Sequence, residues 1–541
     1  MSVALRQKPK AVKTVSPPWW QGGVIYQLYV RSFYDSNGDG VGDLRGVIMK
    51  LDYIKSLGVD AIWLSPVTVS GNADWGYDVI DYKNIDPDLG TMEDFDELLQ
   101  KAKSHGIKII TDLVPNHTST KHPWFQNALT GRNAKYRDYY IWANPKKRRK
   151  PPSNWKSYFG GSAWTYHPPT KQFYLHNFLP EQAELNWRNP KVLDEFDDIM
   201  RFWLDKGVAG FRIDVFNMLI KDERFRDNPK AGEEDGIELR LLGQKPTYNV
   251  SQPEVHSILK RWRKITDSYP EKRLLLGETT LVFDVTKIAT FYGKQDELDM
   301  AFNFGFTQSQ FNAGRLKEIV SETELSIKNP DWPVWTSSNH DTPRFPSRWA
   351  KNDERKIRCA LMLLMCLRGT PVLYYGDELG MPGVFVPPWR LKDPRGKRFW
   401  PVDFGRDQAR TPMPWKNKVG AGFTPEDVRP WLPYGDLRKR SVEVEERRES
   451  TLKYTRDLIK LRHKSDDLKH GDYKLYDTAS SVWVWKRGKK TTIAINMSNY
   501  RHEIEDIKGE IRIATVRRRE GKKIEGRLLL APWEGVVIVE D

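Results

Sequence analysis

The stretch GFRIDVFN, residues 210–217, places two charged side chains, Arg212 and Asp214, inside an otherwise apolar run. Side chains along a strand alternate between its two faces, so these two residues point to the same face. Burying an ion pair is costly and needs a reason. The pair is either a structural salt bridge at a strand end or part of a functional site. The stretch itself fits both interpretations, and the rest of the chain decides between them.

Short β-rich runs alternate with helical patterns over much of the chain, and eight of these runs are candidate strands. They are residues 24–30, 61–66, 108–114, 210–215, 273–278, 298–304, 333–339 and 370–376. Helical segments lie between them, such as the one that begins after an N-cap at Thr91, with Asp94 three residues on, and stops at Gly106. Eight strands with intervening helices predict an α/β fold, a (β/α)8 TIM barrel. A doubly wound sheet is the alternative.

The uneven spacing of the candidate strands predicts two additions to the barrel. The interval between the third and fourth strands is rich in aromatic residues, Pro and Gly, which indicates an inserted small domain at residues 117–190. The barrel would then comprise residues 1–116 and 191–465. Residues 466–541 contain several short strand patterns and predict a C-terminal all-β domain, a β-sandwich.

The composition is typical of a soluble globular protein, with 39% hydrophobic and 29% charged residues. The net charge of +15 comes from 87 basic residues that are interleaved with 72 acidic ones. We therefore interpret the basic clusters at 146–150 and 517–523 as solvated surface and expect no nucleic-acid partner. No apolar run approaches the roughly 20 residues of a membrane helix, so no membrane association is expected.

The two cysteines, Cys359 and Cys366, lie in one apolar run that predicts a single helix. Seven residues along a helix correspond to a rise of roughly 10 Å, which is too far for a disulfide. Reduced thiols are typical of the cytoplasm. The N-terminal residues 1–20 have no apolar core of the kind found in secretory signals. These features predict a cytoplasmic protein.

Polar side chains gather at the carboxyl ends of the predicted strands, where TIM barrels carry their chemistry. They are Asn116 and His117 after the third strand, Arg212 and Asp214 on the fourth, Glu278 at the end of the fifth, and Asn339, His340 and Asp341 after the seventh. Like charges gathered at one end of a barrel repel each other unless a ligand or a reaction offsets the repulsion. The set therefore indicates a functional site more than a structural salt bridge.

Several motifs carry a family resemblance. They are DLVPNH (112–117), GFRIDVFN (210–217), LLLGE (274–278), SSNHD (337–341), QLYVRSFYDSNGDGVGDLRG (27–46), DWGYD (74–78) and GRDQARTPMPW (405–415). In these motifs and their order, the sequence resembles the α-amylase family of glycoside hydrolases (family 13), in its α-glucosidase and oligo-1,6-glucosidase branch. The resemblance extends from about Trp19 to the β-rich tail.

The resemblance implies a role for each matching residue. Asp214 matches the nucleophile, Glu278 the general acid/base, and Asp341 the third carboxylate, which holds the ring hydroxyls of the sugar. The implied substrate-binding residues are Asp74, Tyr77, His117, Phe178, Gln182, Arg212, His340 and Arg410. Among them, Arg212 would orient Asp214 and keep it ionised, as a nucleophile must be. Arg410 would close the pocket.

The chemistry of the two carboxyl groups agrees with these roles. Cleavage of a glycosidic bond with retention needs two carboxyl groups roughly 5–5.5 Å apart, one ionised and one protonated. An arginine beside Asp214 favours its ionised form. The apolar run before Glu278 and its negative neighbours favour the protonated form of that residue.

The loop DSNGDGVGD, residues 35–43, has oxygen donors at alternate positions. They are the side chains of Asp35, Asn37, Asp39 and Asp43 and the carbonyl of Val41. The pattern resembles the start of an EF-hand loop, but Gly46 stands where the bidentate Glu would be. The α-glucosidase branch often has a Ca²⁺-type site in this loop. We predict a structural Ca²⁺, with Mg²⁺ as an alternative ion and a plain Asp/Asn/Gly turn as the alternative structure.

The resemblance implies a retaining, exo-acting α-glucosidase whose substrate is a small sugar. It would hydrolyse terminal α-linked glucose through a covalent glucosyl-Asp intermediate, with transglucosylation as a second outcome. Alternatives are a transferase or isomerase of the sucrose isomerase or trehalose synthase type, an endo-amylase, and a non-enzymatic relative. Val215 after the nucleophile favours α-1,6 bonds, whereas Thr279 and Thr280 after Glu278 depart from the oligo-1,6-glucosidase pattern, so the linkage stays open.

Overall fold

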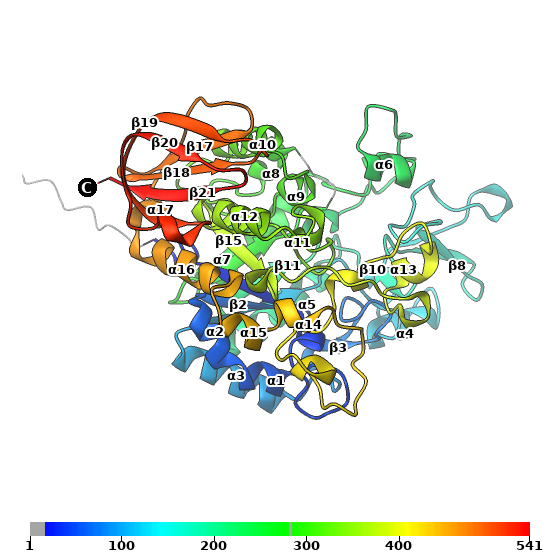
Figure 1. The fold of residues 1–541 in the computed structure, drawn as a ribbon. Helices are drawn as coiled ribbons and strands as arrows, with labels where there is room; N and C mark the ends of the chain where they lie inside the picture. Colours follow the sequence, from blue (N-terminus) through cyan, green and yellow to red (C-terminus); the bar gives the residue numbers. More distant parts are fainter. Residues whose placement is uncertain (1–16, 281–283, 541) are drawn as a thin grey trace, which may run out of the picture.

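The computed structural model describes residues 17–280 and 284–540, and its centre is a parallel barrel (Figure 1). Eight strands form one sheet: β1 (Ile25–Leu28), β2 (Ala61–Leu64), β5 (Lys108–Leu113), β11 (Gly210–Ile213), β12 (Leu274–Gly277), β13 (Met300–Ala301), β14 (Val334–Thr336) and β15 (Thr370–Tyr374). Spatial neighbours follow sequence order around the sheet, and a parallel bridge from Phe302 to Val334 joins its two ends. This confirms the (β/α)8 barrel over the doubly wound alternative, in which the strand order reverses.

Alternation along the strands decides which side chains point into the barrel. On β2, Ala61 and Trp63 belong to the cluster inside the barrel, whereas Ile62 and Leu64 pack outward against the helices. On β11, Phe211 and Ile213 likewise pack outward. The side chain of Arg212 therefore points inward, and its guanidinium lies 5.2 Å from the Trp63 ring centroid.

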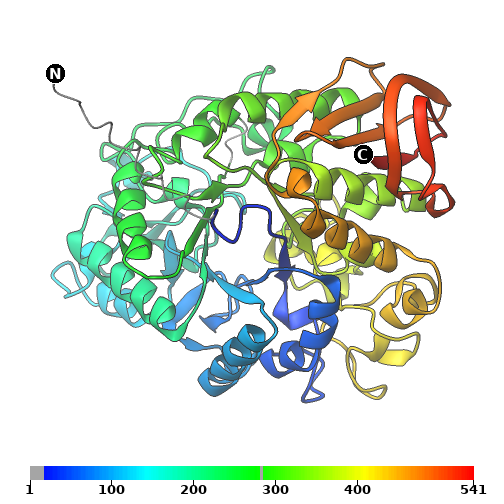
Figure 2. The same ribbon diagram turned by 90° about the vertical axis from the view of Figure 1, so that its left-hand side faces the viewer.

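Helices surround the barrel, as Figure 2 shows. The longest are α3 (Met92–Ser104), α5 (Pro190–Lys206), α7 (Val255–Asp267), α10 (Ala313–Ser326), α12 (Glu354–Cys366) and α16 (Thr451–Lys464). The predicted capping box is confirmed on α3, where Thr91 accepts from the Asp94 amide and Asp94 accepts from the Thr91 amide. Gly106 follows the C-cap in a left-handed conformation, with φ of 74°. No described helix has both the length and the apolar character needed to cross a bilayer.

Two long segments extend from the barrel at its carboxyl end. The first lies between β5 and β11 and contains a three-stranded sheet and a two-stranded ribbon. Its strands are β7 (Trp142–Ala143), β8 (Trp164–His167) and β9 (Gln172–Leu175) in the sheet, and β6 (His117–Ser119) and β10 (Gln182–Glu184) in the ribbon. The second follows β15 and includes α13 (Pro394–Phe399). In Figure 1, α13 lies beside the first segment.

The C-terminal strands form one six-stranded antiparallel sheet. They are β16 (Tyr473–Leu475), β17 (Val482–Arg487), β18 (Thr491–Asn496), β19 (His502–Ala514), β20 (Lys523–Leu530) and β21 (Gly535–Val539). The hydrogen-bonded order is β16-β17-β18-β21-β19-β20, so the all-β domain is confirmed, as a single continuous sheet where we expected a sandwich of two. One face packs Trp483 and Trp485 into the main core, and the other covers its own apolar cluster. The predicted domain boundaries stay predictions.

The C-terminal sheet is fixed to the barrel through the end of α12. Cys359 and Cys366 both lie on this helix as free, buried thiols, as predicted. Burial raises the pKa of Cys366 to about 12. The guanidinium of Arg487, from β17, donates to the carbonyl of Cys366 at 2.8 Å and to that of Gly471 at 2.9 Å. A helix end leaves carbonyls without partners, and here a buried arginine of the second domain supplies one.

Candidate active site

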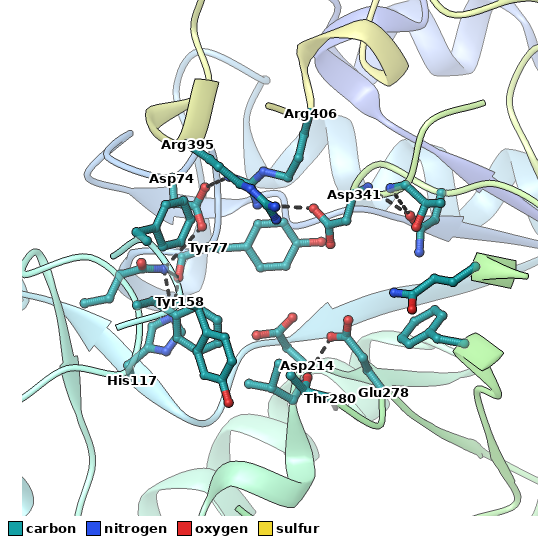
Figure 3. A pocket seen from close by; sticks show the side chains of 18 residues that line it. Asp74, Tyr77, His117, Tyr158, Asp214, Glu278, Thr280, Asp341, Arg395 and Arg406 are labelled. Atoms are coloured by element: carbon teal, nitrogen blue, oxygen red, sulfur yellow. Dashed lines mark hydrogen bonds and ion pairs between the residues drawn. The ribbon is translucent and has the colours of Figure 1, made fainter. Parts of the chain in front are cut away.

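A pocket of about 240 Å³ opens at the carboxyl ends of the barrel strands. Eight of the predicted site residues line it: Asp74, Tyr77, His117, Phe178, Gln182, Asp214, Glu278 and Asp341. They come from the β3–β4 turn, the inserted segment and the ends of β11, β12 and β14, where β3 is Thr68–Ser70 and β4 is Val79–Ile85. In Figure 3, Asp214 and Glu278 lie side by side and face Asp341 and Arg406 across the cavity. The other predicted residues, Arg212, His340 and Arg410, are buried behind its wall.

Arg212 holds three carboxylates at the base of the pocket. One nitrogen, Nη1, donates to Asp214 Oδ1 at 2.8 Å and to Asp112 Oδ1 at 2.9 Å. The other, Nη2, donates to Glu278 Oε2. The guanidinium therefore bridges the predicted nucleophile and the predicted acid, whereas we had assigned it to Asp214 alone. Asp112 lies on the neighbouring strand β5, opposite Arg212. It was not predicted as a site residue.

The protonation of Asp214 needs a correction. Burial raises the pKa of its carboxyl well above the ordinary value, and the nearby charges of Glu278 and Asp112 add to this, while the Arg212 guanidinium opposes it. Arg212 therefore does not hold Asp214 ionised on its own, because its charge is shared among three carboxylates.

Asp341, on the opposite side of the cavity, is held ionised by two arginines. Burial alone would raise the pKa of its carboxyl, but the contact with His340 and the positive charges of Arg406 and Arg410 hold it below the ordinary value. Arg410 Nη2 donates to Asp341 Oδ1 at 3.0 Å, and Arg406 Nη1 donates to the same oxygen at 3.2 Å. Burial lowers the pKa of His340 to about 3, so this neighbour is neutral.

A hydrogen-bonded chain connects the two sides of the pocket behind its wall. Gln27 Nε2 lies 2.8 Å from His340 Nδ1, and His340 Nε2 contacts the Tyr77 hydroxyl. Tyr77 in turn donates to Asp112 Oδ2 at 3.1 Å, and Asp112 accepts from Arg212. The Tyr77 and His340 rings stack with centroids 5.2 Å apart. We infer that His340 positions Tyr77 and Asp341 from behind, whereas the resemblance implied direct contact with the sugar.

His117 is held by a buried ion pair at the junction of barrel and inserted segment. Its Nε2 donates to the Tyr77 carbonyl at 2.9 Å, and Asn116 donates to its Nδ1 at 3.0 Å. Asn116 also donates to Glu184 Oε1 at 2.8 Å and accepts from Lys221 Nζ at 2.9 Å. Lys221 and Glu184 form an ion pair with side chains 1% and 0% exposed. Burial lowers the pKa of His117 to about 4, so it is a neutral donor at neutral pH.

Arg406 is the most connected residue that the sequence analysis missed. It forms ion pairs with Asp74, with Asp341 at 3.2 Å and with Asp393 at 2.7 Å. It stands in the quoted motif GRDQARTPMPW, from which we chose Arg410 as the arginine that closes the pocket. The pocket is also lined by Asn339, one of the polar residues expected at the strand ends, and by residues that were not predicted as part of the site: Tyr158, Phe159, Val215, Thr280, Phe304, Gln308, Thr342 and Arg395.

The loop proposed to bind calcium is closed by its own hydrogen bonds. Asp35 accepts from the amides of Gly38 and Gly40 and from Thr424, and Asp43 accepts from the amide and hydroxyl of Ser36 and from the Gly46 amide. A Cβ on Gly46 would lie 1.9 Å from the Tyr34 carbonyl oxygen, which explains why no Glu stands there. In the described part of the chain, no three acidic, His or Cys side chains gather as metal ligands would. As arranged, the donors do not fit the ion, and the calcium site stays a prediction.

The comparisons with known proteins agree with this geometry. Residues 27–471 match the family model described as "Alpha amylase, catalytic domain". The chain is 38% identical to the trehalose-6-phosphate hydrolase of Escherichia coli (strain K12), over 90% of this chain and 92% of that protein. It is also 38% identical to the oligo-1,6-glucosidase of Parageobacillus thermoglucosidasius, over 84% of this chain and 86% of that one.

A solved structure extends the match to the whole fold. The crystal structure of an α-glucosyl transfer enzyme, XgtA, superposes with a TM-score of 0.90 at 40% identity, covering 97% of this chain and 100% of that one. A barrel with three converging carboxylates, a matching family model over most of the chain and relatives of nearly equal length lead to one conclusion. The chain belongs to the α-amylase family of glycoside hydrolases.

Proposed function

We propose that the protein is a retaining α-glucosidase that removes terminal α-linked glucose from short oligosaccharides or disaccharides. The observation that carries the proposal is the single Arg212 guanidinium that contacts Asp214 and Glu278 together. Retaining enzymes hold their two carboxyl groups roughly 5–5.5 Å apart, whereas inverting enzymes leave a wider gap that admits a water molecule. Two carboxyl groups on one guanidinium support the narrow separation.

Each residue then has a defined step. Asp214 attacks the anomeric carbon while Glu278 gives its proton to the departing glycosidic oxygen, which leaves a glucosyl-Asp214 ester. In the second step Glu278 takes a proton from a water molecule, and this water cleaves the ester with a second inversion. Asp341, kept ionised by Arg406 and Arg410, accepts hydrogen bonds from the ring hydroxyls.

The ion pairs of Arg406 support an exo-acting enzyme. Arg406 joins Asp74 from the β3–β4 turn to Asp341 after β14, and to Asp393 in the segment after β15. These contacts tie three separate segments together across the pocket, beside the sugar-binding residues. Such a closure favours a pocket over an open groove, so we expect only a terminal residue to reach Asp214.

The stereochemistry of the first product tests the proposal. With p-nitrophenyl α-glucoside, the glucose released first should be the α-anomer, followed by NMR before mutarotation. Asp214→Gly should lose turnover, and azide should restore cleavage of the activated substrate with β-glucosyl azide as the product. Near-normal activity in Asp214→Gly, or release of β-glucose by the unaltered enzyme, would reject the assignment.

Transfer of the glucosyl unit to another sugar is the second candidate. The 40% identity to an enzyme described as an α-glucosyl transfer enzyme favours it, because the same intermediate serves both outcomes. The choice depends on whether water or an acceptor reaches the glucosyl-Asp214 ester. Product analysis after incubation with maltose, isomaltose, sucrose, trehalose and trehalose 6-phosphate separates hydrolysis from transfer and ranks the linkages.

A further inference from the structure

Val215, the residue directly after Asp214, has an unusual backbone conformation. Its φ and ψ angles are 35° and 42°, in the left-handed region. A β-branched side chain is strongly disfavoured there, and such strain persists only where the surrounding structure imposes it. The side chain is 5% exposed and packs with Met218 and Val250. The strained residue therefore stands between the predicted nucleophile and a packed cluster.

The turn at Val215 places a backbone donor on the predicted acid. It ends β11 abruptly, and the Met218 amide closes the turn on the Val215 carbonyl at 2.8 Å. The Val215 amide donates to Glu278 Oε2 at 3.3 Å instead of to a strand carbonyl. Glu278 itself is fixed directly after β12, because its amide donates to the Ile213 carbonyl at 2.9 Å. The strained turn therefore directs a backbone N–H at the carboxyl group of the predicted acid.

We propose that Val215 is a positioning residue whose backbone N–H, together with Arg212, binds Glu278 Oε2 and leaves the transferable proton on Oε1. An oxygen that accepts two N–H donors is the less favourable place for a proton. The proton then resides on the other oxygen of the same carboxyl group, from which it can pass to the glycosidic oxygen. This inference rests on the proposed function, in which Glu278 is the general acid.

The charged groups around Glu278 determine the direction of the effect. Arg212 favours the ionised form of Glu278, whereas Asp214, Asp112 and, across the cavity, Asp341 favour the protonated form. The Val215 N–H acts in the same direction as Arg212, because a donor stabilises the charged carboxylate. Loss of this N–H should therefore keep Glu278 protonated to higher pH.

The test replaces the Val215 amide with an ester, by incorporating the α-hydroxy analogue of valine at this position. The side chain stays, and an ester oxygen replaces the N–H. We expect the basic limb of kcat/KM against pH, measured with p-nitrophenyl α-glucoside, to move up by about half a unit to one unit. Val215→Gly retains the N–H and adopts the left-handed turn without strain, so its basic limb should coincide with that of the unaltered enzyme. An unmoved limb in the ester variant, or an equal shift in Val215→Gly, overturns the proposal.

A second measurement uses the unaltered enzyme, with Glu278→Gln as its control. In protein labelled with ¹⁵N-valine, the Val215 amide resonance should titrate with the midpoint of the basic limb, and this titration should disappear in Glu278→Gln. A Val215 resonance that is constant across that limb overturns the proposal. The outcome is independent of the proposed function, because release of β-glucose would reject retention while the amide titration would still report the contact with Glu278.

Discussion

Removal of the Arg212 charge should shift the pH dependence of catalysis upward. In Arg212→Met the side chain keeps much of its length, but Asp214, Asp112 and Glu278 lose their common cation. The pKa of Asp214 is already raised by burial, with Arg212 as the opposing charge. The nucleophile must be ionised, so the acid limb of kcat/KM reports this carboxyl in the free enzyme.

The size of the shift follows from the contacts. An opposite charge within about 4–6 Å lowers the pKa of a carboxyl by roughly 1–3 units. Arg212 is in direct contact with Asp214 at 2.8 Å, so its loss should move the acid limb up by about 1–3 pH units. At a pH below the shifted limb, kcat/KM falls about tenfold for each pH unit of the shift, which gives roughly a 10- to 1000-fold loss of activity. Glu278 shares the same guanidinium, so the basic limb should move in the same direction.

The assay is kcat/KM for p-nitrophenyl α-glucoside across the pH range, with melting temperature as a check on folding. Asp112→Asn is the matched control of opposite sign, because it removes a carboxylate that raises the pKa of Asp214 and leaves Arg212 with two partners. Its acid limb should move down. The reasoning fails if Arg212→Met keeps the acid limb in place, or if both variants move it in the same direction.

Three further outcomes test the structure around the site. Lys221→Met should lower the free energy of unfolding by about 3–5 kcal/mol in urea titration, because it leaves Glu184 charged and buried. The double variant with Glu184→Gln should recover part of the lost stability, and an unchanged urea midpoint in Lys221→Met would contradict the prediction. If loop 35–43 binds calcium, chelation should lower the melting temperature more than the initial rate, whereas no metal by elemental analysis and no change in melting would count against the ion. Arg487→Met should cost about 1–3 kcal/mol, because the buried carbonyls of Cys366 and Gly471 both lose their charged donor, with equal stability as the contrary result.

The alternation of side chains along strands explains why the barrel and most of the site could be predicted from the sequence. It placed Arg212 and Asp214 on one face of one strand, and the structure shows that this face is the interior of the barrel. The same alternation applies to β5, where Ile110 points into the barrel and Leu113 outward. Asp112 lies in phase with Ile110 and could have been found by this argument, because a carboxylate on an inward face needs a partner.

Arg406 could not be found in this way. It lies in the long segment after β15, which has no periodicity that would assign its side chains to a face. Its importance comes from three acidic residues that approach it from separate parts of the chain, and only the fold brings them together. Arg406 and Arg410 stand in one motif and both donate to Asp341, so the motif alone does not indicate that Arg406 also contacts Asp74 and Asp393. Spacing along a loop does not distinguish a side chain in the cavity wall from one behind it.

The balance of charge around the pocket is itself an argument for the chemistry. Six carboxyl groups are gathered there, Asp74, Asp112, Asp214, Glu278, Asp341 and Asp393, against the three guanidinium groups of Arg212, Arg406 and Arg410. Burial raises the pKa of both Asp74 and Asp112 to about 6, so the site tends to retain protons, yet negative charge still exceeds positive charge at neutral pH. A neutral sugar does little to relieve this excess. The oxocarbenium-like transition state carries positive charge on its ring, and fixed carboxylates stabilise it more than they stabilise the ground state.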